Sequence, residues 1–73
     1  MINRDLIDSQ ALHIFVVISE SQSLTDAANR LGVTQSAVSQ SLKGLEGLMG
    51  VELVVRRTTP LRLTHAGLAL KQQ

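Results

Sequence analysis

The sequence predicts a small, mainly α-helical domain that also contains one β-hairpin. Two observations carry this prediction. Between residues 24 and 49, apolar residues recur at helical spacing, with hydroxyl residues and glycines where helices would begin and end. Between residues 51 and 63, β-branched and alternating residues flank a proline, which is typical of two short strands and a turn. At 73 residues the chain makes one domain at most, and such a domain buries only about 60% of its unfolded surface.

Residues 24–43 predict two helices joined by a tight turn. The first helix has apolar residues on one face, at positions i, i+3, i+4 and i+7: Leu24, Ala27, Ala28 and Leu31. Ser23 precedes it with Asp26 three places on, close to a capping box in which the acid has a shorter reach than the usual Glu. Gly32 can end this helix in the left-handed conformation, and Thr34 can cap the next one.

The next helix is expected from Gln35 to Met49, followed by Gly50, with Val33 as the apolar pivot of the turn before it. One stripe of this helix is apolar: Val38, Leu42, Leu45 and Met49. The opposite side is polar and almost uncharged: Gln35, Ser36, Ser39, Gln40 and Lys43. Two helices joined by a short turn with glycine form a helix-turn-helix, and Gln and Ser can hydrogen-bond base edges in the major groove. An ordinary helical hairpin with a solvated polar face is the alternative.

The second half of this helix is expected to be its less stable part. It contains Gly44 and Gly47, each up to about 1 kcal/mol less favourable than Ala in a helix. Leu45 and Leu48 are nevertheless expected to pack inward.

A first helix is expected from Leu6 to Ser19. Its core-facing residues are expected to be Leu12, Phe15 and Val16. The β-branched run at 14–18 also fits a buried strand, but a helix is favoured because residues 6–19 contain neither Gly nor Pro. A helix that is apolar on two sides must be covered twice, and we expect the segment from Thr64 to supply the second cover.

Residues 51–56 and 61–63 are expected to pair as the strands of a hairpin, the wing. Pro60 lacks a backbone donor and belongs at the tip or on an edge. An extended loop without pairing is the alternative. The tip is rich in Arg and Thr, a composition that suits phosphates or the minor groove.

A last helix is expected from His65 to Gln73, with Thr64 as its N-cap. The sequence reaches Gln73 without a helix stop signal. We therefore expect the helix to continue in a longer protein.

The chain resembles the LysR-type transcriptional regulators. The resemblance covers about Leu6 to Lys71 and rests on blocks in matching order and spacing: Phe15, Ser23–Leu24, Ala27–Ala28, Leu31, QSAVSQ at 35–40, LE at 45–46, Gly50–Leu53 and LTHAG at 63–67. It implies a mainly α, winged helix-turn-helix DNA-binding domain over residues 1–63, with a three-helix core and a two-stranded wing. Residues 64–73 would then begin a dimerising linker helix.

The same resemblance implies the partners of a longer protein. They are double-stranded DNA, a second copy in a homodimer or a dimer of dimers, and a small-molecule effector held by a further domain. The stretch LVVRRTTPLRLT at 53–64 resembles more narrowly the branch that regulates basic amino-acid export.

Predicted DNA contacts lie on the helix that starts at Gln35 and on the wing. Through the resemblance, the start of that helix contacts bases, Arg56 is the wing arginine, and Leu45–Glu46 is a structural pair whose Glu does not contact DNA. Two positions depart from the family: Gln40 stands where many members have Arg, and Val54 where many have Phe. Gln pairs bidentately with adenine, whereas Arg would favour guanine. The predicted contact residues are Thr25, Thr34, Gln35, Ser36, Ser39, Gln40, Lys43, Arg56, Arg57, Thr58 and Thr59.

The net charge of +1 is low for a nucleic-acid binder, but its distribution favours that function. Residues 1–30 carry two basic and four acidic side chains, a balance of −2, whereas residues 31–73 carry five and two, a balance of +3. The positive charge thus lies on the half expected to contact DNA. The rival hypothesis is a protein-interaction module, which would need aromatic or large apolar anchors on the outward helix face.

Other classes of function find no support in the sequence. There is no Cys, and His13 and His65 stand alone, so no metal or cofactor is expected. No nucleophile elbow, P-loop or dinucleotide fingerprint occurs, and no acid and base are paired, so the chain is not expected to be an enzyme. The longest apolar run, Ile14–Ile18, is too short to cross a membrane. We expect a cytoplasmic protein associated with the nucleoid.

Overall fold

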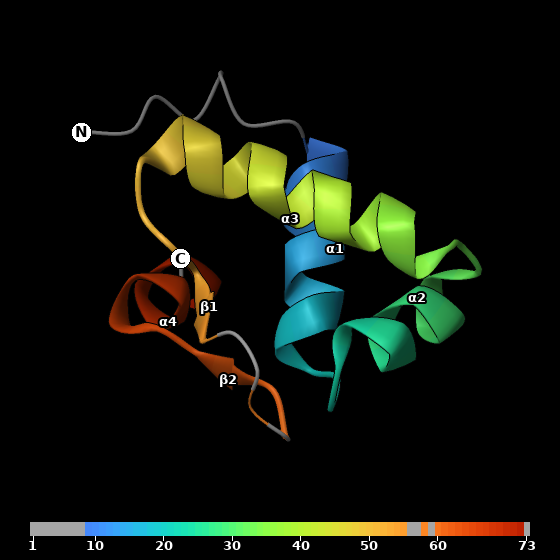
Figure 1. The fold of residues 1–73 in the computed structure, drawn as a ribbon. Coiled ribbons are helices and arrows are strands. Elements are labelled where there is room, and N and C mark those ends of the chain that lie inside the picture. The colour runs from blue at the N-terminus through green and yellow to red at the C-terminus, as the bar shows by residue number, and fades with distance from the viewer. Residues whose placement is uncertain (1–8, 56–57, 59, 73) are drawn as a thin grey trace.

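The computed structural model describes residues 9–55, 58 and 60–72, and within these residues it has the predicted winged helix-turn-helix architecture (Figure 1). Three helices form the core, a two-stranded hairpin follows, and a further helix comes last. The elements in order are α1 (Ser9–Ser19), α2 (Leu24–Leu31), α3 (Gln35–Met49), β1 (Val54–Val55), β2 (Arg62–Leu63) and α4 (His65–Lys71).

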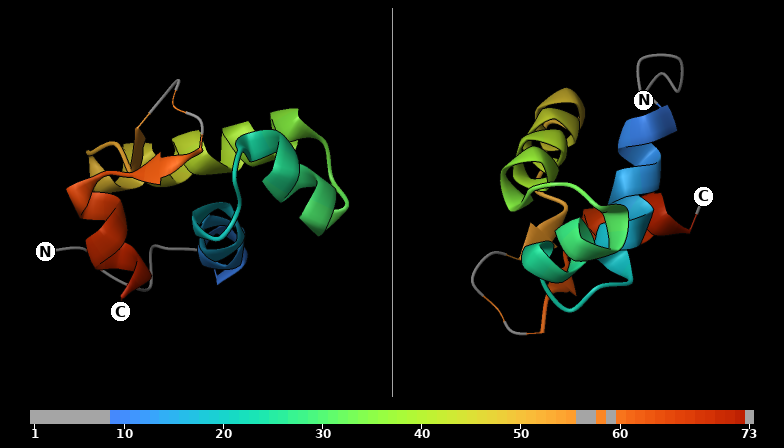
Figure 2. Two further views of the ribbon diagram at one scale, coloured as in Figure 1. Left: turned by 90° about the horizontal axis from the view of Figure 1, so that it is seen from below. Right: turned by 90° about the vertical axis from the view of Figure 1, so that its right-hand side faces the viewer.

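The three core helices contact one another, and α4 contacts both α1 and β2. Figure 2 shows α1 running across α3, with α2 beside the N-terminal end of α3 and α4 on the same side of α3 as α1. Leu70 of α4 is buried. The expectation that the segment after Thr64 covers α1 is confirmed.

The predicted helix caps are present. The side-chain oxygen of Ser23 accepts the N–H of Asp26 at 3.0 Å, and Thr34 Oγ1 accepts the N–H of Ala37 at 3.1 Å. The carboxylate of Asp26 accepts the N–H of Gln22 at 3.1 Å, one residue before the N-cap that a full capping box would reach. Gly32 has φ 71°, in the left-handed region that glycine enters at no steric cost, so it ends α2 as predicted.

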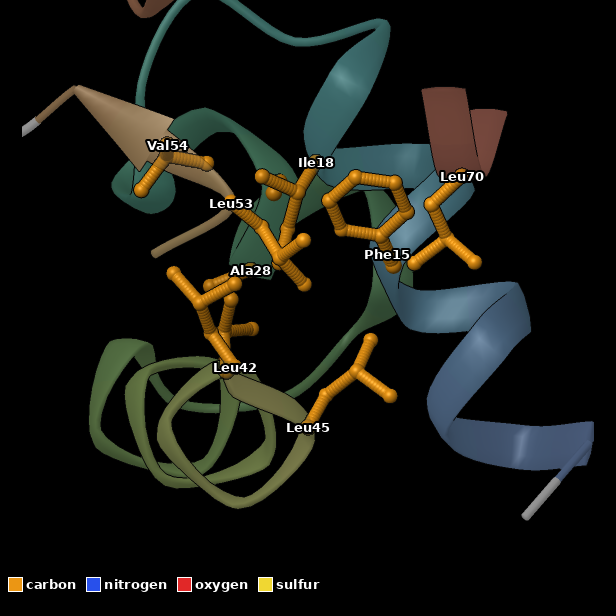
Figure 3. Packing of buried hydrophobic residues seen from close by; sticks show 10 residues of the cluster. Phe15, Ile18, Ala28, Leu42, Leu45, Leu53, Val54 and Leu70 are labelled. Carbon is orange, nitrogen blue, oxygen red and sulfur yellow. The ribbon is translucent and has the colours of Figure 1, made fainter. Parts of the chain in front are cut away.

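The core draws on every helix and on the start of the hairpin. Its buried members are Phe15, Ile18, Ala27, Ala28, Val38, Leu42, Leu45, Leu53, Val54 and Leu70. In Figure 3 the ring of Phe15 lies beside Ile18 and Leu70. Phe15 and three residues of the α3 stripe, Val38, Leu42 and Leu45, were predicted to be core, and this is confirmed. Leu12 and Met49 are only partly buried and pack against the cluster.

Two apolar residues predicted to be covered, Val16 and Leu48, are exposed, and so is Val33, the predicted pivot of the turn. Val16 is 39% exposed, Leu48 is 45% exposed and Val33 is 46% exposed. On α1 the buried face passes through Phe15 and Ile18, and Val16 lies about 100° around the helix from Phe15. On α3 the buried stripe ends with Leu45 and Glu46, and Leu48 lies off it. The tight turn is held by the backbone, because the N–H of Val33 donates to the carbonyl oxygen of Ala28 at 3.0 Å.

The wing is paired, but over fewer residues than predicted. Val54 pairs with Leu63 and Val55 with Arg62 in antiparallel register, so the extended loop without pairing is wrong. Residues 51–53 are not a strand, and the N–H of Leu53 donates to Glu46 of α3. Pro60 lies between the two strands, as expected.

The end of α4 differs from prediction, whereas the predicted start of the first helix is not tested. The expected start of α1 at Leu6 and the last residue, Gln73, lie outside the described residues. The helix α4 ends at Lys71, with Gln72 as its C-cap. None of the helices in the described ranges has the length and apolar character needed to cross a membrane.

Candidate nucleic-acid interface

The start of α3 presents a polar face to solvent. Ser39 is half-buried, and the other four predicted contact residues of this helix are exposed: Gln35, Ser36, Gln40 and Lys43. Val38 and Leu42, on the opposite side, are fully buried in the core. Burial of that stripe fixes the rotation of α3, so the polar face is held outward.

Local structure positions this face. Thr34 caps α3 and is itself exposed, as is Thr25 in the first turn of α2. The first backbone N–H groups of a helix point along its axis and favour anions. The two predicted contact residues Thr34 and Gln35 lie together at the N-terminal start of α3, whereas Thr25 lies at the N-terminal start of α2.

The wing adds a second predicted contact region. Thr58 is half-buried, and its hydroxyl donates to the carbonyl oxygen of Val55 at 3.3 Å. The predicted contacts Arg56, Arg57 and Thr59 lie outside the described residues. Arg62 was not predicted as a contact, yet it is exposed on β2. The alternation Leu61–Arg62–Leu63 was the signal for its outward direction, because successive side chains of a strand point to opposite faces.

The base of the wing is tied to the rest of the domain by hydrogen bonds on both sides. On one side the N–H of Leu53 donates to Oε2 of Glu46 at 2.7 Å. On the other side the N–H of Leu61 donates to the carbonyl oxygen of Gln22 at 2.8 Å. Glu46 is only 8% exposed, so its expected structural role fits the geometry. Its hydrogen bond to Leu53 was not predicted, although an acid on the buried side of a helix was a visible signal.

The helix α4 starts against Leu53, at the base of the wing. Its N-cap, Thr64, donates its N–H to the carbonyl oxygen of Leu53 at 3.0 Å and its hydroxyl to the carbonyl oxygen of Glu52 at 2.7 Å. A Cβ added to Gly67 would overlap the carbonyl oxygen of Leu53. Only glycine therefore allows α4 to lie this close to the base of the wing.

Among the residues that the structure describes, the other charged side chains do not suggest another kind of site. Asp26 and Arg30 form an ion pair at 3.3 Å on α2, with both side chains partly exposed, and such surface pairs are weak. His13 and His65 are exposed. Over the part of the chain that the structure describes, no three His, Cys, Asp or Glu side chains are grouped in a way that could hold a metal ion.

Comparison with known proteins decides the family. Residues 9–68 match the family described as "Bacterial regulatory helix-turn-helix protein, lysR family". The chain belongs to the LysR family. As the helix-turn-helix domain of a LysR-family regulator, it is a sequence-specific DNA-binding domain.

Relatives and solved structures of the LysR family are similar to the chain throughout the described fold. The HTH-type transcriptional regulator TdcA of Escherichia coli K12 is 46% identical over 59 residues, covering 81% of this chain and 19% of TdcA. The DNA-binding domain of BenM, solved in complex with benA site 1 DNA, is 32% identical with a TM-score of 0.86, covering 90% of this chain and 74% of that one. LysG of Corynebacterium glutamicum, solved full-length with bound effector Arg, is 36% identical with a TM-score of 0.83, covering 90% of this chain and 22% of LysG.

The LysR-family chain spans about a fifth of the length of the curated relatives it matches. It corresponds to their helix-turn-helix part, since the matched family region covers α1 to the first turn of α4.

Proposed function

We propose that α3 enters the major groove of double-stranded DNA while the wing lies along the backbone or the adjacent minor groove. The observation that carries this proposal is the outward polar face of α3, which starts at a capped helix end and is backed by the buried residues Val38 and Leu42. The likeness to the BenM domain, which was solved in complex with DNA, supports DNA as the partner.

In this proposal, side chains in the first turns of α3 contact the base edges. Four side chains there carry hydrogen-bond donors and acceptors without a formal charge: Gln35, Ser36, Ser39 and Gln40. Such groups recognise base edges, and a Gln at position 40 is suited to adenine. Ser39 is half-buried, so its hydroxyl reaches less far than the neighbouring amides.

Cationic and hydroxyl side chains around this face contact the phosphate backbone of the DNA or its minor groove. The proposed phosphate or minor-groove contacts are Thr25, Thr34, Lys43, Arg56, Arg57, Thr58 and Thr59, to which we add Arg62. Contacts of this kind set the register of a protein on the duplex and make binding depend on salt. The exposure of Thr25, Thr34, Lys43 and Arg62 supports this assignment.

The organisation of the longer protein is also part of this proposal. Residues 1–63 form the DNA-binding domain, and residues 64–73 begin a helix through which two copies associate. A further domain takes a small-molecule effector. The length of the curated relatives and the effector in the LysG structure support this organisation. The regulator acts on DNA in the cytoplasm and has no catalytic step.

Binding-site selection from random double-stranded DNA tests the proposal. The 73-residue chain should enrich one short sequence, and a longer, dimeric protein should enrich two copies related by two-fold symmetry about one helical turn apart. Fluorescence anisotropy should then show tighter binding to the selected sequence than to a scrambled one. An interaction module would enrich no sequence and would bind both duplexes equally weakly even at low salt.

A further inference from the structure

Leu53 is the residue at which α3, the wing and α4 meet. Its side chain is fully buried. Its N–H donates to Glu46 of α3, and its carbonyl oxygen accepts the N–H of Thr64, the N-cap of α4. The residue that leads into the wing is therefore held through its side chain and through both of its backbone polar groups.

Glu46 supplies the side chain of α3 in this junction. Its backbone carbonyl oxygen accepts the N–H of Gly50 at 2.8 Å, which ends the helix. Its carboxylate meanwhile spans the turn at 50–52 to reach the N–H of Leu53 at 2.7 Å. A hydrogen bond to a charged acceptor is shorter and stronger than one between neutral groups, so this bond fixes where the wing starts relative to α3.

The wing is too short to set its own direction. Over the described residues its strands have two residues each, and isolated two-stranded hairpins are marginal in water even when longer. The direction of the wing therefore depends on what holds its base. Before the first strand, Glu46 accepts the N–H of Leu53. Before the second strand, the carbonyl oxygen of Gln22 accepts the N–H of Leu61.

We propose that Glu46 is a positioning residue for DNA binding, which holds the wing at the distance from α3 at which both can contact one duplex. This inference rests on the proposed function. Glu46 is buried beside the wing base, and its negative charge opposes that of the phosphates. Removal of the charge should strengthen DNA binding if electrostatics alone matter. Loss of the positioning hydrogen bond should weaken it, so the two effects have opposite signs.

The test compares Glu46→Ala and Glu46→Gln with Glu52→Ala and Glu52→Gln. Glu52 is a matched control, because it is exposed and carries the same charge, while the bond it makes in the junction uses its backbone carbonyl oxygen. For each variant, dissociation constants are measured on selected and scrambled DNA at several salt concentrations, below the melting temperature found by circular dichroism. Hydrogen exchange at the N–H of Leu53 reports the bond directly.

We expect Glu46→Ala to weaken binding to both duplexes alike, with the base preference retained. The slope of log affinity against log salt should fall by about one unit for each phosphate that the wing no longer reaches. The N–H of Leu53 should exchange faster. Glu46→Gln keeps an acceptor oxygen and should give an intermediate slope, while the Glu52 variants should bind as tightly as the unaltered chain or more tightly.

The proposal is overturned if folded Glu46→Ala keeps the original salt slope or tightens binding as Glu52→Ala does. If Glu46→Ala does not fold at the assay temperature, the pair Glu46→Gln and Glu52→Gln decides: weaker binding with a lower slope in the first supports the proposal, and equal binding overturns it. Failure of the proposed function is a separate result, because the unaltered chain would then show no sequence preference.

Discussion

Truncation of Leu42 should test the rotation of α3, on which the outward direction of the polar face depends. Leu42 is 1% exposed and belongs to the core cluster shown in Figure 3. Leu42→Ala removes three buried carbon atoms and leaves a cavity, and such changes cost about 2–5 kcal/mol. A domain of 73 residues is stable by about 4–11 kcal/mol in total. The substitution should therefore remove a large part of the free energy of unfolding.

Thermal unfolding followed by circular dichroism measures this effect. Since 1 kcal/mol shifts the melting temperature of a domain of this size by about 4–8 °C, Leu42→Ala should lower it by at least about 8 °C. Leu48→Ala is the matched control, because it is the same change on the same helix at a residue that is 45% exposed. Its cost should be within about 0.5 kcal/mol. Similar shifts for the two variants would refute the rotation of α3 and, with it, the assignment of the polar face.

Further predictions concern contacts with bases, contacts with the DNA backbone, and the stability of two glycine variants. Gln40→Ala should cost about 1–3 kcal/mol on the selected sequence and relax the choice at one base pair; equal weakening on scrambled DNA would contradict the adenine contact. Arg56→Ala should weaken all sequences alike and lower the salt slope by about one unit, whereas a loss confined to A·T-rich, narrow-groove DNA would indicate a minor-groove contact instead. Gly44→Ala should raise the free energy of unfolding by up to about 1 kcal/mol, because an added Cβ meets open space. Gly67→Ala should lower the melting temperature, because its Cβ would overlap the backbone of Leu53; a melting temperature at or above that of the unaltered chain would contradict the close packing of α4.

Features that depend on neighbouring residues could be predicted from the sequence. Ser23, Gly32 and Thr34 mark the ends of α2 and the start of α3 because cap hydrogen bonds and left-handed glycines are local. The polar and apolar sides of α3 follow from helical periodicity for the same reason. The contact residues of the wing tip stay predictions, since Arg56, Arg57 and Thr59 lie outside the described residues.

Packing between distant segments could be predicted only in outline, as for the cover of α1 by α4, and its details could not. Periodicity identifies an apolar face but does not say how far a neighbouring element extends over it, so Val16 and Leu48 were wrongly expected to be covered. The hydrogen bond from Leu53 to Glu46 joins residues on either side of a helix end. Its direction depends on how the chain turns after Gly50, which propensity and spacing do not specify.

The contact between Gly67 and Leu53 helps to set the direction of α4, and a small tilt at the start of a helix becomes a larger displacement farther along it. An α-helix rises 1.5 Å per residue, so a point 20 residues farther along would lie about 30 Å away, and a tilt of about 10° at the base would move it by about 5 Å. That displacement exceeds the spacing of about 3.4 Å between successive base pairs. In an assembly joined through α4, the separation of the two DNA-binding domains would therefore depend in part on the contact between Gly67 and Leu53. A change at that contact would alter the preferred distance between half-sites and leave the bases within each half-site unchanged.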